Sequence, residues 1–187
     1  GYHLVNIAIH LANVLLVYTL VRTFLATPAF SAPRGTNDSL RHPFLEEWAP
    51  FFTAAFFACH PLQSQAVTYI TQRFASLAAL FYLGAVLCHV RWRLVEKPLR
   101  LRIGALALAL LAMMSKELSA TLPVVLLLIE FVFFGSTLRS AARRVWPFFL
   151  TVAVIPLLML YVSHHLGTES VQAVIARAQK VPHPVDY

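Results

Sequence analysis

Six long apolar stretches constrain this chain more than any other feature of its sequence. Each approaches the roughly 20 helical residues that are needed to cross the hydrocarbon core of a bilayer. Because that core offers no water to backbone polar groups, such stretches must be helical. The sequence therefore predicts an all-α fold, a polytopic membrane helix bundle with about six transmembrane helices. We place these helices at about Tyr2–Val21, Pro43–Cys59, Phe74–Val90, Leu99–Met114, Leu118–Gly135 and Trp146–Val162.

The composition agrees with a membrane protein. Hydrophobic residues make up 59% of the chain and charged residues 12%, which is too apolar for an ordinary soluble domain. We expect one transmembrane domain over residues 1–187, with an outward-facing tail from about 163 to 187. The start has no initiator methionine and no basic leader, so we interpret the chain as an internal fragment and not as one that begins with a signal peptide. Pro50 would bend the second stretch, and a re-entrant helix is an alternative there.

The distribution of Lys and Arg predicts the orientation of the bundle. Basic residues are retained on the cytoplasmic side of a membrane, and six spans place most of the fifteen on one side. The ends of the chain, the loop at His60 and the loop at Lys116 then face outward. The net charge of +7 is thereby assigned to loops near anionic lipid, and no nucleic acid is expected as a partner.

Polar side chains form a stripe along the first apolar stretch. His3, Asn6, His10 and Asn13 follow one another at spacings of three or four residues, which places them on one face of a helix. Two interpretations are open. The stripe forms hydrogen bonds between helices, as amides and imidazoles do in membrane bundles, or it lines a polar cavity that opens outward.

The segment ACHPLQSQAVTYITQRFASLAAL, residues 58 to 80, interrupts the apolar sequence with polar groups. Pro61 disfavours helix at His60, so the second helix should end there. Beyond this corner, Gln65 and Gln72 fall on one polar stripe of a helix, with Arg73 beside it. We expect that stripe to face an outward cavity.

Two further charged sites lie near the ends of predicted spans. Lys116 and Glu117 form a short outward loop, where they are either a solvated surface pair or part of a functional site. Glu130 lies near the cytoplasmic end of its span, and we expect it to pair with Arg139 or with a neighbouring helix.

This topology gathers cations, a carboxylate and neutral donors at the outer membrane face. Arg offers phosphate a planar fork and Lys a point charge, and a carboxylate or imidazole can accept a proton from a hydroxyl. Such a set of groups suits the headgroup of a phosphorylated lipid. In a transfer reaction from that lipid, the cations would stabilise the phosphate as it departs. No metal-ligand spacing appears, so no metal and no other cofactor are expected. We assign donor-phosphate binding to Arg73 and Lys116, catalytic roles to Glu117 and His60, and cavity lining to Gln65, Gln72, His3, His10 and His164. His60 would shape the headgroup site, and Glu117 would orient Lys116.

Three segments carry a family resemblance: HLVNIAIHLANVLLVYTLV, FFACHPLQSQAVTYITQRFASLAALFYL and LLAMMSKELSATLPVVLLLIE. Together they resemble the membrane part of the tetratricopeptide-repeat glycosyltransferases. These are similar to the metazoan protein O-mannosyltransferases that act on cadherins, within the wider GT-C fold. The resemblance covers roughly Tyr2 to Tyr161, and His60-Pro61, Arg73 and Lys116-Glu117 are its most specific points.

The resemblance implies a partial GT-C-like fold and a transferase activity. The donor would be a sugar on a polyprenyl phosphate, either dolichyl or undecaprenyl, and the acceptor a protein hydroxyl presented from the lumen or periplasm. The implied partners are thus the donor lipid, an acceptor protein and membrane lipid. The bacterial inner membrane is the expected location, and the endoplasmic reticulum membrane is the alternative.

The resemblance also implies parts that this chain does not contain. Relatives place an acidic catalytic residue in the first outward loop, which would precede Gly1, and a soluble repeat domain after the membrane part. Many also carry acidic residues where this chain has Gln65 and, just after the arginine, Phe74 and Ala75. We therefore expect the enzyme to need flanking segments of its own chain.

A noncatalytic membrane protein, such as a transporter piece or an assembly scaffold, is the alternative function. It predicts polar residues along a path through the membrane. Such residues are scarce inside the third to fifth spans, which disfavours a conduit.

Overall fold

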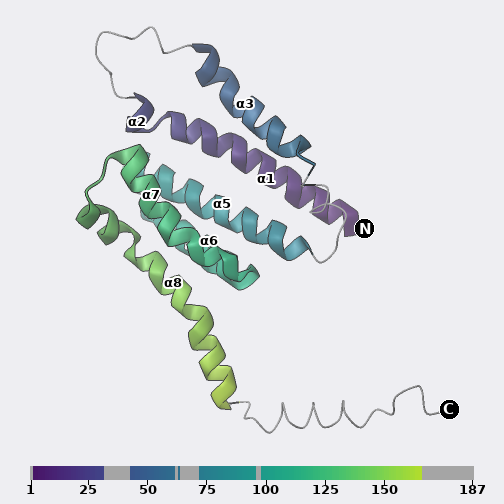
Figure 1. The fold of residues 1–187 in the computed structure, drawn as a ribbon, viewed down its shortest axis with the longest axis vertical. Helices are drawn as coiled ribbons and strands as arrows, with labels where there is room; N and C mark the ends of the chain where they lie inside the picture. The colour runs from purple at the N-terminus through teal and green to yellow at the C-terminus, as the bar shows by residue number, and fades with distance from the viewer. Residues whose placement is uncertain (1, 32–42, 62, 64–71, 96–97, 166–187) are drawn as a thin grey trace, which may run out of the picture. The chain divides into compact units, whose positions relative to one another are not determined.

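The computed structural model describes residues 2–31, 43–61, 63, 72–95 and 98–165. The described part is all-helical, as predicted, and contains no strand (Figure 1). Its helices are α1 (Tyr2–Leu25), α2 (Pro28–Ser31), α3 (Pro43–Cys59), α5 (Arg73–Leu94), α6 (Leu99–Ser115), the 3₁₀ helix η3 (Glu117–Thr121), α7 (Leu122–Phe134) and α8 (Leu138–His165). The chain divides into two compact units, Gly1–Val152 and Ala153–Tyr187, with the boundary inside α8.

Proline and glycine set several helix ends. α3 begins at Pro43, where a proline costs no hydrogen bond, and ends at Cys59, directly before the His60-Pro61 corner that predicted its end. α7 ends at Gly135, whose φ of 55° is a conformation that residues with a side chain rarely adopt. The backbone N–H of Ser136 then donates to the Glu130 carbonyl at 3.0 Å, which closes the helix end.

The first unit is built around α1 and α5. α1 packs against both α3 and α5, and α5 packs along α6 (Figure 1). Asn6, near the start of α1, contacts Arg73 at the start of α5, and His10 contacts Ala58 at the end of α3. The start of α1, the end of α3 and the start of α5 therefore lie together, in what we call the polar end. Successive long helices run in opposite directions, as the orientation argument requires.

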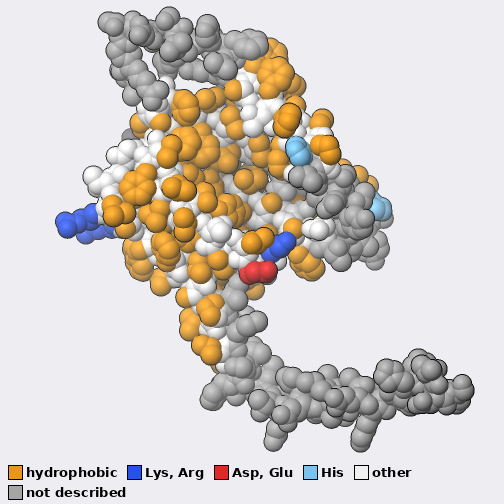
Figure 2. Space-filling model, viewed as in Figure 1, with side chains coloured by type: hydrophobic (Ala, Val, Ile, Leu, Met, Phe, Trp, Pro, Cys, Tyr) orange, Lys and Arg blue, Asp and Glu red, His pale blue; other side chains and the backbone are white. Residues whose placement is uncertain are grey.

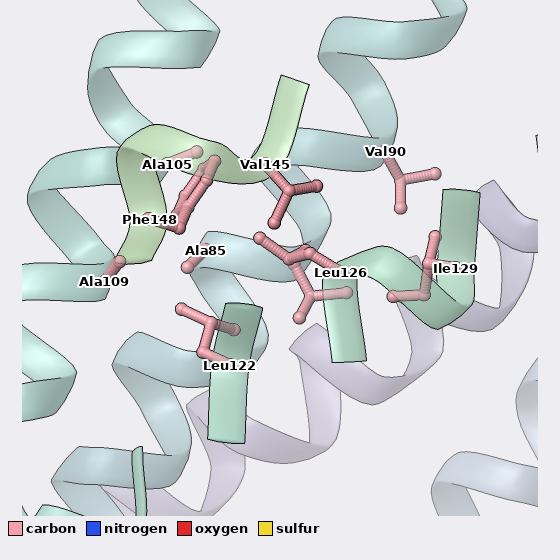
Figure 3. Packing of buried hydrophobic residues seen from close by; sticks show 10 residues of the cluster. Ala85, Val90, Ala105, Ala109, Leu122, Leu126, Ile129, Val145 and Phe148 are labelled. Atoms are coloured by element: carbon pink, nitrogen blue, oxygen red, sulfur yellow. The ribbon is translucent and has the colours of Figure 1, made fainter. Parts of the chain in front are cut away.

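A cluster of buried apolar residues joins α5, α6, α7 and the start of α8. Figure 3 shows alanines of α5 and α6 facing leucine and isoleucine side chains of α7 and the aromatic ring of Phe148. Small residues allow membrane helices to approach closely, so the packing is tight without polar groups. The cluster contains Ala85, Val86, Val90, Ala105, Ala109, Leu122, Leu126, Ile129, Val145 and Phe148.

The count of six membrane spans is not confirmed. Three described segments are long and apolar enough to cross a membrane: His3–Leu25, Arg73–Leu94 and Glu117–Phe134. α3 and α6 have 17 residues each, fewer than the roughly 20 that a crossing needs. α8 carries Arg139, Arg143 and Arg144 near its start, which shortens its apolar length.

The described surface is that of a membrane protein. Figure 2 shows hydrophobic side chains covering most of the visible face. Over the whole described surface, Leu4, Phe56 and Leu99 are each more than two-thirds exposed, at 75%, 76% and 69%. Soluble proteins rarely expose such continuous apolar area, so this surface requires lipid or a protein partner around it.

Candidate functional site

Two buried asparagines of the first helix join α1 to α5. Asn6 accepts a hydrogen bond at its Oδ1 from Nε of Arg73 (3.0 Å), and Asn13 donates through Nδ2 to the Ser76 carbonyl (3.1 Å). Of the two interpretations of the stripe, interhelical hydrogen bonding therefore holds for these residues. In low-dielectric surroundings such bonds fix the relative position of the two helices.

The histidines of the same stripe differ from each other. His10 is half-buried, its Nε2 lies 3.3 Å from the Ala58 carbonyl oxygen, and its ring stacks on Phe57 with centroids 5.9 Å apart. It therefore joins α1 to α3. His3 is exposed and lies about two turns closer to the start of α1.

Arg73 is the first residue of α5 and is half-buried at the polar end. Its bond to Asn6 engages Nε, one of the five N–H groups of a guanidinium. The acceptor is a neutral amide oxygen, so this bond holds the side chain in place without cancelling its charge. A positioned guanidinium at a helix start is what binding to a phosphate requires.

Lys116 and Glu117 occupy the corner between α6 and η3. Lys116 has an extended backbone (φ −160°, ψ 137°), and its N–H donates to the Ala112 carbonyl at 3.0 Å, which ends α6. Its side chain is half-buried, whereas Glu117 is exposed at the start of η3. Within the described residues the two side chains form no ion pair with each other, and the role of Glu117 in orienting Lys116 stays a prediction.

Two glycines give the register between α5 and α6. A Cβ atom at Gly84 would lie 3.2 Å from Cδ1 of Leu108, and one at Gly104 would lie 3.9 Å from Sγ of Cys88. These facing pairs run in opposite chain directions. When this pairing is continued for two helical turns beyond Leu108, Lys116 lies at the same height along the bundle as Ser76. Ser76 is about one turn from Arg73. Arg73 precedes Gly84 by about three full turns, so its Cα–Cβ bond starts from the same face of α5.

An apolar cavity lies between α1 and α3 and has a volume of about 680 Å³. Three of its seven described lining residues are phenylalanines of α3, and the polar side chains of His60 and Gln63 follow the end of that helix. The ring of Phe56 meets that of His60 edge-on, with centroids 5.9 Å apart. The lining residues are Val17, Phe52, Thr53, Phe56, Phe57, His60 and Gln63. The cavity is on the α3 side of α1, whereas Arg73 approaches α1 from α5.

The remaining predicted site residues are less informative. Gln72 is half-buried just before α5, and its carbonyl accepts a bond from the Ser76 hydroxyl at 3.3 Å. Gln65 lies outside the described residues. His164 belongs to the last turn of α8, and its side chain also falls outside the described part. Arg73 and Lys116 do not line the cavity that contains His60.

A second polar cluster, at the opposite end of the bundle, surrounds the fully buried Glu130 of α7. Its Oε1 lies 2.9 Å from Nε of Arg93 and 3.1 Å from Nε2 of His89, and its Oε2 lies 3.2 Å from Nη1 of Arg144. The Ser136 hydroxyl also donates to Oε2, at 2.8 Å. Glu130 thus joins α5, α7 and α8.

The expected pairing of Glu130 with Arg139 is wrong, and pairing with neighbouring helices is confirmed. Arg139 is exposed and, in the part of the chain that the structure describes, makes no ion pair. Arg139 lies in the first turn of α8, whereas Arg144 lies about one and a half turns further along that helix and contacts Glu130 of α7. The sequence signal for the true partners was the RWR motif that ends α5, together with the Arg143-Arg144 pair.

No group of three His, Cys, Asp or Glu side chains that could hold a metal ion occurs among the residues that the structure describes. The side chains available for the candidate site are cations, imidazoles, amides and the carboxylate of Glu117. These groups can bind an anion and exchange a proton.

Comparison with known proteins yields one relative. No family model and no solved structure matches the chain. The chain is similar to the protein O-mannosyl-transferase Tmtc2 of Drosophila melanogaster, with 32% identity over 126 residues. The match includes 65% of this chain but only 11% of that relative. The resemblance to protein O-mannosyltransferases is thus confirmed in part.

Proposed function

We propose that this chain is part of a membrane glycosyltransferase that transfers a sugar from a polyprenyl-phosphate donor to a hydroxyl group of a protein. The observation that carries the proposal is the similarity to an O-mannosyl-transferase over 126 residues. Because the chain spans 11% of that relative, the complete activity would depend on further segments of the protein. An acidic catalytic residue is expected in one of them.

Arg73 and Lys116 would bind the donor phosphate. The bond that Arg73 donates to Asn6 holds its side chain, and the α5–α6 register, continued to the end of α6, supports a position of Lys116 within about one helical turn of Arg73 along the bundle. Two cations near the leaving phosphate stabilise the negative charge that develops as the sugar departs. Glu117, at the same corner as Lys116, would orient that lysine.

The cavity between α1 and α3 would accommodate part of the donor lipid. Phe52, Phe56 and Phe57 offer apolar contact to a prenyl chain, while His60 and Gln63 offer hydrogen-bonding groups to its headgroup. Gln72, His3 and His10 would line an outward space, and the same role stays a prediction for Gln65 and His164.

The endoplasmic reticulum membrane is the location that we propose, with the polar end facing the lumen. The relative is an animal protein, so the match gives no support to the bacterial inner membrane that the sequence favoured. The Lys and Arg distribution supports the sidedness.

A noncatalytic scaffold is the second candidate. The observation in its favour is that Asn6, His10 and Asn13 all form bonds between helices, which a purely structural bundle also requires. This candidate predicts no sugar transfer.

The decisive experiment measures sugar transfer by the full-length protein, with polyprenyl-phosphate mannose as donor and an acceptor protein. Arg73→Ala should lower the rate about 100-fold or more, because it removes a cation from the developing charge. Arg22→Ala is the control, since Arg22 is an exposed arginine at the other end of α1. Normal turnover by Arg73→Ala would remove the phosphate-binding role, and no transfer by the unaltered protein would favour the scaffold.

A further inference from the structure

The cluster around Glu130 carries more positive than negative charge. One carboxylate is shared by two guanidinium groups, those of Arg93 and Arg144, at 2.9 and 3.2 Å. A third guanidinium, that of Arg102 in α6, adjoins the cluster through the Arg144 main chain. We call this region, defined by Arg93, Arg102, Glu130 and Arg144, the arginine end. This surplus positive charge favours binding of a further anion.

Arg102 is held in a fixed orientation. Its Cζ lies 4.5 Å from the ring centroid of Trp92, a buried side chain of α5, and its Nη2 donates to the Arg144 carbonyl at 3.0 Å. Stacking and this hydrogen bond together fix the plane of the guanidinium. Its other N–H groups have no protein partner among the described residues, and the side chain is half-buried.

The side chain of Arg144 is also held in a fixed orientation. Its Nη1 donates to Glu130 and to the Ser136 hydroxyl, at 3.2 and 3.1 Å, and its side chain is 27% exposed. Nη1 is thus fully engaged, whereas Nη2 forms no bond within the described part. Arg102 and Arg144 therefore present preoriented donors on two adjoining helices.

The surroundings indicate what kind of anion would fit. Arg91, Arg100 and Arg143 are exposed on the same helix ends. Leu99 and Ile103, beside Arg102 on α6, are exposed apolar side chains at 69% and 57%. A ligand at this place needs a negative group next to an apolar chain.

We propose that the arginine end binds the headgroup phosphate of an anionic phospholipid, with Arg102 and Arg144 as its donors. The acyl chains lie against Leu99 and Ile103. Glu130, Arg93 and Trp92 hold the two donors in position. Such a site differs from the general attraction of a basic loop to a membrane, because it depends on guanidinium geometry and not on charge alone.

A pair of charge-conserving substitutions tests this distinction. The full-length protein is purified in nanodiscs of phosphatidylcholine and phosphatidylglycerol, and native mass spectrometry measures how many of the retained lipids are phosphatidylglycerol. Arg102→Lys keeps the charge but loses the planar fork and much of the stacking on Trp92. Arg22→Lys makes the same change at an exposed arginine outside the arginine end.

Arg102→Lys should weaken the preference for phosphatidylglycerol about tenfold, while Arg22→Lys leaves it unchanged. Circular dichroism and thermal unfolding of both variants establish that they are folded. An unchanged preference in folded Arg102→Lys would overturn the proposal. Equal losses in the two variants would overturn it as well, since they would show that the lipid responds to the protein surface as a whole.

Discussion

At the scale of single residues, the arginines at the two ends of the bundle have different partners. At the polar end, Nε of Arg73 donates a hydrogen bond to the neutral amide oxygen of Asn6. At the arginine end, Arg93 and Arg144 share the buried carboxylate of Glu130. The bond at the polar end positions Arg73, whereas the shared carboxylate joins α5, α7 and α8 and also positions Arg144 for the proposed lipid phosphate.

Glu130→Gln tests the importance of the buried carboxylate. The substitution keeps the shape of the side chain but leaves Arg93 and Arg144 without their counter-charge. We expect a loss of about 3 kcal/mol in the free energy of unfolding, as is typical when one partner of a buried ion pair is removed. Reversible unfolding in mixed detergent micelles measures the change.

The matched control is Arg139→Gln, which alters an exposed residue near the start of α8. It should change the free energy of unfolding by less than about 0.5 kcal/mol. Equal stability of the two variants would contradict the role assigned to Glu130.

The sequence predicts residue contacts only where spacing along one helix decides them. The stripe of His3, Asn6, His10 and Asn13 was visible from its period, and three of its members do bond to other helices. Which atoms they meet depends on how α1 sits against α3 and α5, and no local pattern encodes that. For the same reason the sequence suggested Arg139 for Glu130, although Arg93 and Arg144 are the partners.

At the scale of elements, helix positions followed from apolar length and from proline. The expected spans Leu99–Met114 and Pro43–Cys59 agree closely with α6 and α3, because Pro98 and Pro61 mark the adjoining turns. The number of membrane-spanning helices could not be predicted from apolar length alone. A 17-residue helix is long enough to pack in a bundle but marginal for crossing a bilayer.

The approach of α5 to α6 depends on Gly84. A Cβ atom there would lie 3.2 Å from Leu108, so the two further methyl groups of valine must displace that side chain or the helix. Gly84→Val should lower the free energy of unfolding by about 1–3 kcal/mol, as overpacking usually does. Unfolding in mixed micelles again provides the measurement.

Gly104→Ala serves as the comparison at the same helix pair. Its Cβ would meet Sγ of Cys88 at an ordinary 3.9 Å, and alanine favours helix by up to about 1 kcal/mol. This variant should be as stable as the unaltered protein or slightly more so. If Gly84→Val left the free energy of unfolding unchanged, α5 and α6 would not be packed as closely at Gly84 as described.

At the scale of the whole chain, the sequence predicted that the charged residues divide between two ends of the bundle. It did not predict the geometry of the candidate site. The distribution of Lys and Arg assigned the span ends to two opposite sides, and which of these sides faces outward stays a prediction. Whether Arg73 and Lys116 approach one ligand depends on the register and rotation of α5 against α6. These follow from Gly84, Gly104 and their facing side chains, which have no signature in a single sequence.

The central claim is that these two cations, distant in the chain, act on one phosphate. A double-mutant cycle on sugar transfer by the full-length protein tests it, with Arg73→Ala, Lys116→Ala and the combined variant. If both cations bind the same phosphate, the combined loss in kcat/KM will differ from the product of the single losses by at least about fivefold. Single losses that multiply, or an unaffected rate in either single variant, would contradict the account.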